Sequence, residues 1–213
     1  MTKYVLGVDG GGTKTDYLLF DTGGNLIAHL RGAGTNHEGL AGGMEELEQL
    51  LNATIPPFLK EHGLAPADLA GSVFGMAGVD VPGQQAAIEG MYRRMGFGDI
   101  RVMNDSFIGI KAGSRRGYGI CVVNGTGNTV GGIDRKGQWL QVAGTGYISN
   151  EVGGAGRIAE QALRAVYREL FSLGEPTAMT PKVMNLLGVS DPVYYIEALY
   201  QKYHTREIVP KDI

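Results

Sequence analysis

The stretch GVDGGGTKTD, which starts at Gly7, places backbone, hydroxyl, ammonium and carboxylate groups within ten residues. Gly7 and Gly12 have the separation of the P-loop glycines, but Thr13 stands where that motif has its lysine, and Lys14 comes one place late. A P-loop also needs a helix directly after its glycines, because the helix N-terminus supplies the amides that hold phosphate. The segment DYLLFDTGGNLIAHL, which begins at Asp16, is instead typical of strand, turn and strand. The glycines are therefore expected at the tip of a β-hairpin.

A glycine-rich hairpin can still bind phosphate, since residues without Cβ let the backbone approach closely and let successive amides point into one concavity. The candidate donors are the backbone of Gly10, Gly11 and Gly12, the Thr13 hydroxyl and the Lys14 ammonium. For Lys14, a solvated hairpin position is an equally good interpretation. A hairpin that merely turns tightly is the alternative for the whole stretch.

Two carboxylates could act beside such a phosphate site. Asp105 stands where a predicted strand ends and a predicted helix begins, the position that faces the ligand crevice of an open α/β sheet, so it is our candidate for the base that orients an acceptor hydroxyl. The alternative is that Asp105, or Ser106, caps the helix. Asp9 is expected to orient Mg²⁺ or its water shell, because hard cations prefer oxygen ligands. A structural role at the hairpin base is the alternative for Asp9.

The same pattern returns in GICVVNGTGNTVGGIDRKGQWLQVAG, residues 119–144, which again indicates strand, glycine-rich tip, strand, turn and strand. Asn124 takes the place of Asp9, while Gly125 and Gly127 take those of Gly10 and Gly12. Between them Thr126 offers a hydroxyl, and Asn128 offers an amide to phosphate or sugar. We interpret this as an internal repeat at domain scale, with domains at 1–117 and 118–213.

The elements that must position these residues alternate between helix and strand after the initial hairpins. Apolar residues at helical spacing predict a helix over 38–62, which Pro56 and Pro57 should interrupt or kink. Further strands are expected at 72–78 and 99–105, and further helices at 83–96, 106–113, 156–171, 180–188 and 191–204. This order predicts an α/β layered domain with a mixed sheet.

Composition narrows the class of protein. The 213 residues are 43% hydrophobic, enough for a real core, and the formal charge of −3 gives no sign of nucleic acid as a partner. A single cysteine, Cys121, excludes an intramolecular disulfide and a cysteine-cluster metal site within one chain. No apolar run has transmembrane length and no signal-peptide pattern precedes the first strand, so we expect a cytoplasmic protein that has no membrane partner.

Four stretches resemble the actin-like, hexokinase and Hsp70 superfamily, and most closely its BadF-type ATPase and N-acetylglucosamine kinase branch. They are GVDGGGTKTD as a first phosphate motif, GTNH at 34–37 as a sugar-contacting loop, VMNDSFIG at 102–109 as a catalytic-aspartate motif, and NGTGNTVGG at 124–132 as a second phosphate motif. The resemblance implies a ribonuclease H-like, actin/hexokinase-type two-domain α/β fold, with a mixed five-stranded sheet flanked by helices. It assigns Thr35 and Asn36 to sugar contact.

The function implied is ATP-dependent phosphorylation of an amino sugar, N-acetylglucosamine or glucosamine, with ATP–Mg²⁺ between hairpins 10–13 and 125–128 and Asp105 as base. One alternative is another sugar kinase, of the repressor, open-reading-frame and kinase type, which usually carries a cysteine-rich zinc loop. Another is a BadF-type ATPase that acts as a conformational activator; those hold an iron–sulfur cluster through paired cysteines, which one cysteine does not supply. A binding module without turnover is the remaining alternative, and a homodimer is left open.

The chain departs from the family pattern in two places. Where the N-acetylglucosamine kinases resemble GDEGS, this chain has NEVGG at 150–154, so Glu151 is the one acid left to contact the sugar. After residue 171 only two helical segments remain, so the second domain is expected to be incomplete and the functional unit longer. An incomplete domain would leave apolar faces uncovered.

Overall fold

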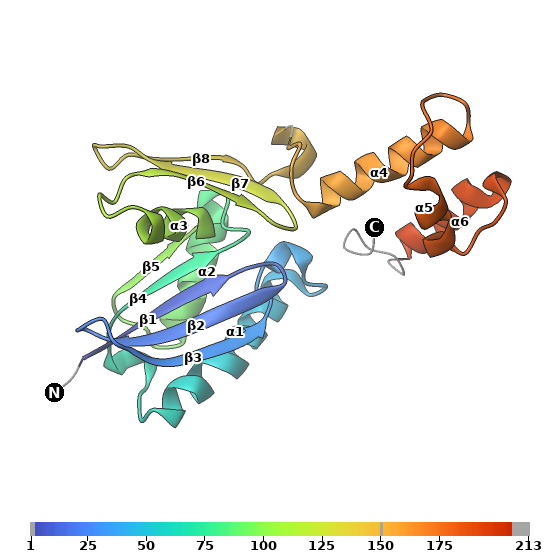
Figure 1. Ribbon diagram of the computed structural model, residues 1–213. Helices are drawn as coiled ribbons and strands as arrows, with labels where there is room; N and C mark the ends of the chain where they lie inside the picture. The colour runs from blue at the N-terminus through green and yellow to red at the C-terminus, as the bar shows by residue number, and fades with distance from the viewer. Residues whose placement is uncertain (1–2, 150, 206–213) are drawn as a thin grey trace. The chain divides into compact units, whose positions relative to one another are not determined.

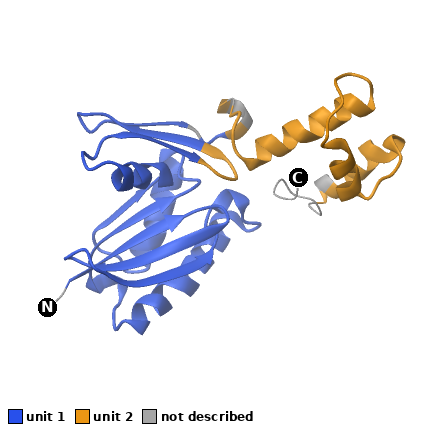
Figure 2. Cartoon of the chain, in the orientation of Figure 1, with its two compact units in different colours: residues 1–123, 129–145 blue, residues 124–128, 146–213 orange. Residues whose placement is uncertain are grey.

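The computed structural model describes residues 3–149 and 151–205, and it divides them into two compact units. Unit 1 comprises residues up to 123 together with 129–145, and unit 2 comprises 124–128 together with the residues from 146 onward (Figure 2). The domain boundary between residues 117 and 118 stays a prediction.

Unit 1 is built on a mixed five-stranded sheet with strand order β3-β2-β1-β4-β5 (Figure 1). β2 runs antiparallel to β1 and β3, whereas β1, β4 and β5 are parallel. The sheet and its flanking helices confirm the predicted α/β fold class. The strands are β1 (Tyr4–Gly10), β2 (Lys14–Asp21), β3 (Leu26–Ala33), β4 (Leu69–Met76) and β5 (Ile100–Met103).

The main core lies on one face of this sheet, beneath helices α1 (Gly43–Glu61) and α2 (Pro82–Arg94). Alternate strand residues point into it, since successive side chains of a strand face opposite ways. Helix α3 (Asp105–Gly113) packs on the opposite face, where a Cβ on Gly75 would lie 2.5 Å from the Ile108 side chain. Asp9 alternates with the buried Val8 and so lies on the α3 face.

Helix α1 differs from its prediction at both its start and its middle. It begins at Gly43, after a short 3₁₀ turn at His37–Gly39, and it continues without a break through Pro56 and Pro57. Each proline removes one amide donor, so the carbonyls of residues 52 and 53 lose their helical partners. Both of those residues are exposed to solvent, where water can satisfy the freed carbonyls.

A second, three-stranded sheet covers the other side of α3. It has the order β6-β7-β8, with β6 at Gly119–Asn124, β7 at Asn128–Ile133 and β8 at Trp139–Ala143. Its inner face packs on α3 through Phe107, Ile110 and Ile133, and the Phe107 and Trp139 rings lie 4.6 Å apart. Helix α3 is therefore held between two sheets (Figure 1).

The outer face of this sheet carries apolar side chains that are open to solvent. Ile120 and Leu140 are 78% and 68% exposed, and Val122 and Val142 are also exposed. In the β7–β8 register Val130 pairs with Val142 and Gly132 with Leu140, so these residues share one face, opposite to the face that packs on α3. We call these four residues, together with Ile120 and Val122 of β6, the outer apolar face.

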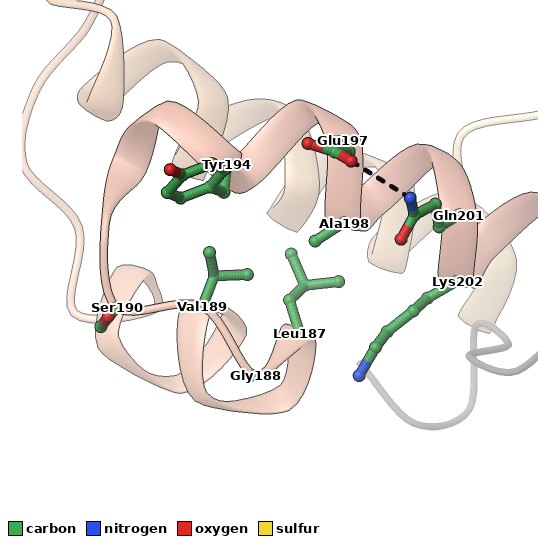
Figure 3. Close-up of a pocket in the computed structure, with 9 residues that line it drawn as sticks. All are labelled: Leu187, Gly188, Val189, Ser190, Tyr194, Glu197, Ala198, Gln201 and Lys202. Atoms are coloured by element: carbon green, nitrogen blue, oxygen red, sulfur yellow. Dashed lines mark hydrogen bonds between the residues drawn. The ribbon is translucent and has the colours of Figure 1, made fainter.

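Unit 2 is mainly helical, with α4 (Ala155–Leu170), α5 (Thr180–Leu187) and α6 (Tyr195–His204) around a small core. The Tyr195 hydroxyl donates to the Leu163 carbonyl at 3.0 Å and ties α6 to α4. An open pocket of about 430 Å³ lies between α5 and α6, where Glu197 accepts a hydrogen bond from Gln201 (Figure 3). None of the predicted site residues lines this pocket. Within residues 3–149 and 151–205, no helix has the length and apolar character needed to cross a membrane.

Candidate functional site

In unit 1 the predicted residues gather at one edge of the five-stranded sheet. The parallel strands β1, β4 and β5 end at Gly10, Met76 and Met103, and their carboxyl ends meet at this edge. The segments directly after them are the glycine hairpin, the loop 77–81, and the start of α3 at Asp105. Ligands of open α/β sheets bind outside the carboxyl ends of such strands.

The first hairpin tip is held by its own backbone and by both neighbouring loops. The Gly11 amide donates to the Lys14 carbonyl at 3.0 Å, the Thr35 amide to the Gly11 carbonyl at 2.9 Å, and the Ala77 amide to the Gly10 carbonyl at 2.7 Å. Residues 12–14 are exposed, and the amides of residues 12 and 13 have no acceptor within the part of the chain that the structure describes. These two amides fit a phosphate group, which accepts such hydrogen bonds.

The loop predicted to contact sugar lies beside this tip, but its two side chains make local bonds. Thr35 is 2% exposed, and its hydroxyl lies 2.8 Å from that of Thr15. The Asn36 side-chain oxygen accepts from the Glu38 amide at 3.0 Å and so caps the short 3₁₀ turn. The structure thus brings Thr35 and Asn36 to the site edge, and their sugar contacts stay predictions.

Asp105 is the first residue of α3, and Asn104 is the cap. The Asn104 side-chain oxygen accepts from the Ser106 amide at 3.0 Å and from the Ser106 hydroxyl at 2.7 Å. Burial, and then the negative charge of Asp9, raise the pKa of Asp105 to about 6, against a smaller lowering by the amides of Ser106 and of Asp105 itself. A carboxylate with this pKa can accept a proton near neutral pH.

Asp9 pairs across the hairpin with Asp16, and both lie on the α3 face. Asp16 binds Arg31 through two hydrogen bonds of 2.7 and 3.0 Å and His29 through one of 2.8 Å. These bonds, that to Arg31 first, lower the pKa of Asp16 to about 2. Partial desolvation and then the Asp16 charge raise the pKa of Asp9, while Lys14 opposes them. Two carboxylates with opposite pKa shifts therefore stand side by side at the hairpin.

We tested whether this set of residues fits a magnesium ion. Among the described residues, no group of three or more histidine, cysteine or acidic side chains is arranged to hold a metal. Mg²⁺, however, keeps several waters and takes one or two carboxylates together with the phosphates of its nucleotide. The exposed Asp9 carboxylate beside the free amides of the tip fits that requirement.

In unit 2 the second hairpin tip is tied to the start of α4. The Ala155 amide donates to the Gly125 carbonyl at 2.8 Å and the Gly156 amide to the Thr126 carbonyl at 3.3 Å. The Asn124 side-chain oxygen accepts from the Gly154 amide at 2.7 Å. Gly154 has a φ of +85°, and a Cβ there would lie 2.9 Å from the Gly127 Cα, so the close approach requires glycine.

Asn128 and the segment that carries Glu151 meet at the same place. A Cβ on Gly153 would lie 2.8 Å from the Asn128 side-chain nitrogen, which itself lies 3.4 Å from the Asn124 oxygen. Glu151 accepts from the Gly146 amide at 2.7 Å and from the Ser149 hydroxyl at 2.8 Å. Asn150, the first residue of NEVGG, lies outside the described residues.

Sequence reasoning missed a polar cluster at the edge of unit 1. Asp80 accepts hydrogen bonds from Asn104, at 3.0 Å, and from Gln141. One signal was present: Asp80 comes soon after a buried strand, in the same way that Asp105 comes after β5. Its partners are 24 and 61 residues away, so the pattern of the sequence could not indicate them.

Two curated kinases are similar to this chain in sequence. The N-acetylmuramic acid/N-acetylglucosamine kinase of Clostridium acetobutylicum is 27% identical over 206 residues, which cover 96% of this chain and 67% of the kinase. The N-acetyl-D-glucosamine kinase of Dictyostelium discoideum is 23% identical over 201 residues, which cover 89% of this chain and 62% of the kinase. The chain thus spans about two thirds of the length of these relatives.

Two solved structures and one family model are also similar to this chain. The crystal structure of a candidate N-acetylglucosamine kinase from Chromobacterium violaceum matches 99% of this chain and 76% of its own, with a TM-score of 0.67 and 20% identity. A second candidate N-acetylglucosamine kinase, from Porphyromonas gingivalis, matches 94% of this chain and 66% of its own, with a TM-score of 0.57 and 21% identity. At these identities the likeness establishes the fold. The sequence model of the BadF/BadG/BcrA/BcrD ATPase family matches residues 6–210, and the chain therefore belongs to that family.

Proposed function

We propose that this chain carries the phosphate-binding and catalytic residues of an ATP-dependent amino-sugar kinase. The observation that carries the proposal is the environment of the Asp105 carboxylate. Asn104 caps α3, so the Asp105 carboxylate does not serve as the cap, and the pKa of Asp105 is raised to about 6. Family membership and two relatives named as kinases of N-acetylated sugars support it. The acceptor that we favour is N-acetylglucosamine or glucosamine.

Asp105 would accept the proton of the sugar hydroxyl, the 6-OH in our proposal, as that oxygen attacks the γ-phosphorus of ATP in line. The bond between the γ-phosphorus and the bridging oxygen breaks, and ADP leaves. Because the partly buried carboxylate is held at the first turn of α3, which is packed between two sheets, it loses little freedom when the sugar binds.

The hairpin residues would hold the nucleotide phosphates. The amides of Gly12 and Thr13, the Thr13 hydroxyl and the Lys14 ammonium are exposed at the first tip. Gly125, Thr126 and Gly127 form a second exposed tip, which offers backbone amides and the Thr126 hydroxyl. Magnesium bound through Asp9 would neutralise phosphate charge as it develops during transfer. The candidates for contacts with the sugar remain Thr35, Asn36, Asn128 and Glu151.

The experiment measures ADP release with ATP and Mg²⁺ over a panel of N-acetylglucosamine, glucosamine, N-acetylmuramic acid, N-acetylmannosamine and glucose. We expect release that depends on one of the amino sugars, and a fall of about 10²- to 10⁴-fold in Asp105→Asn, the usual contribution of a general base. Asp134→Asn is the matched control, because the Asp134 carboxylate accepts hydrogen bonds from two amides of the β7–β8 turn, away from the predicted site residues. ADP release that no sugar stimulates, or full turnover in Asp105→Asn, contradicts the proposal.

A further inference from the structure

Asp80 joins three separate parts of unit 1 through one carboxylate. It lies in the loop after β4, and its Oδ1 accepts from the Asn104 side chain, at the start of α3, and from the Gln141 side chain, on β8. A Cβ on Gly144 would lie 2.7 Å from the same oxygen, so the backbone after β8 also closes around it. An oxygen enclosed in this way has little room to move.

Asn104 is the link between Asp80 and the catalytic helix. Asn104 is 2% exposed, and both ends of its side-chain amide are hydrogen-bonded: the nitrogen donates to Asp80, and the oxygen accepts from the amide and the hydroxyl of Ser106. Ser106 is fully buried. An amide group that is bonded at both ends cannot rotate without breaking one of its hydrogen bonds. The Asp80 oxygen therefore fixes which end of Asn104 caps α3.

The loop that carries Asp80 is braced on its other side as well. The Gln84 side-chain oxygen accepts from the amides of Asp80 and Val81 at 2.9 and 3.0 Å. The Gln84 nitrogen donates to Glu38 at 3.2 Å, two residues after Asn36. The same short loop thus connects the segment predicted to contact sugar with the start of the helix that carries Asp105.

We propose that Asp80 is a positioning residue, which sets the orientation of Asp105 by holding Asn104 in its capping orientation. The proposal rests on the proposed function of Asp105. Asp80 touches neither the sugar nor the nucleotide in this scheme; it acts through Asn104. A displacement of a reacting group by about 1 Å can cost a hundredfold in rate, so the effect should appear in kcat.

The test compares Asp80→Ala, which removes the acceptor, with Asp80→Asn, whose side-chain carbonyl oxygen can still accept from Asn104. Asp134→Ala is the control, since it removes a carboxylate that accepts two amides in the β7–β8 turn. We expect Asp80→Ala to lower kcat by about 10- to 100-fold with the KM values for sugar and ATP changed less than about threefold. Asp80→Asn should recover kcat to within about threefold of the unmodified chain, and the control should leave it unchanged per folded molecule.

Amide NMR separates this proposal from the proposed function, because it needs no turnover. In Asp80→Ala the Ser106 amide resonance should shift and its hydrogen exchange should speed up by about tenfold or more, with no such change in Asp80→Asn or Asp134→Ala. If the unmodified chain shows no sugar-dependent turnover, the proposed function fails, and the Ser106 amide alone decides the positioning role. An unchanged Ser106 amide in Asp80→Ala overturns the proposal. The proposal is also overturned if Asp80→Asn loses as much kcat as Asp80→Ala, because the negative charge of Asp80 would then matter and not its hydrogen bond.

Discussion

At the scale of single residues, Asp9, Asp16 and Asp105 of unit 1 differ in pKa because their surroundings differ. Asp16 has Arg31 and His29 as partners, and its pKa falls to about 2. Burial and the charge of Asp9 disfavour the ionised form of Asp105, so its pKa rises to about 6. Burial disfavours the charged form of a carboxylate, whereas a cationic partner favours it. The same side chain is thus prepared as a fixed anion at one position and as a proton acceptor at another.

The raised pKa of Asp105 predicts the pH dependence of both rate and stability. Turnover should rise with pH through about 6, because the base must be ionised to accept a proton. The folded state holds this proton more tightly than the unfolded state, so folding stability is lost as pH rises from about 4 through 6. Asp105→Asn should therefore be more stable than the unmodified chain at pH 7, by about 1 to 2 kcal/mol after allowance for partial exposure.

Urea denaturation of both chains at pH 5 and at pH 8 checks this prediction, with the larger gain expected at pH 8. Asp16→Asn is a control of opposite sign. Its carboxylate has a lowered pKa, so its contribution to stability is present above about pH 4 and is lost as pH falls toward 2. Removal of that charge should therefore destabilise the chain at pH 7. An Asp105→Asn variant that is no more stable at pH 8 than the unmodified chain would be inconsistent with a carboxyl group whose pKa is raised by burial.

At the scale of elements, helix α3 depends on close packing between two sheets, and glycine makes that packing possible. A Cβ on Gly131 of β7 would clash with the Ser106 hydroxyl and lie 3.0 Å from the Ser106 Cβ. Ser106 is fully buried and bonded to Asn104, so it has no space to move aside. A Cβ on the next residue, Gly132, would only touch the Leu140 carbonyl at 3.7 Å, an ordinary contact on the outer apolar face.

These neighbours make a matched pair of substitutions. Gly131→Ala should lower the free energy of unfolding by about 1 to 3 kcal/mol, the usual cost of overpacking. Gly132→Ala should be neutral or stabilise the chain by up to about 1 kcal/mol, because alanine loses less backbone entropy on folding than glycine does. Chemical denaturation of the two variants measures both effects. Equal destabilisation by the two alanines would show that β7 does not pack on α3 in this way.

The strands could be predicted from the sequence because alternation and turn residues are local signals, and β1 to β8 lie where apolar runs and glycine-rich turns indicated. The start of helix α1 could not be predicted in the same way, since the apolar residues at helical spacing continue into the loop that ends at Gly42, before the helix begins at Gly43. The alternative that Asp105 or Ser106 caps α3 is wrong, because the side chain of Asn104 caps this helix. The direction of side chains could not be predicted from the sequence either, because no local pattern indicates that the Thr35 hydroxyl points inward toward Thr15.

At the scale of the whole molecule, the chain forms two compact units, and each carries one glycine-rich hairpin tip. The internal repeat at domain scale, with domains at 1–117 and 118–213, stays a prediction, because these units have other bounds. In unit 1 a tip lies beside a carboxylate at the end of parallel strands, and in unit 2 a tip is tied to the N-terminus of α4. Each tip is approached closely by a glycine of another segment, Gly34 beside Gly12 at the first tip and Gly154 beside Gly127 at the second.

The outer apolar face of unit 1 leads to a prediction about the surface of the whole molecule. Contiguous exposed apolar side chains on a flat sheet bind hydrophobic dyes and favour association. Because Ile120 and Leu140 are largely exposed already, Ile120→Lys and Leu140→Lys together should sharply reduce the fluorescence of bound anilinonaphthalene sulfonate. They should change the free energy of unfolding by less than about 1 kcal/mol, as exposed substitutions usually do. Gln138→Lys, at an exposed polar position of the β7–β8 turn, controls for added charge. Dye fluorescence that the double variant leaves unchanged, or a cooperative loss of stability, would mean that this face is covered in solution.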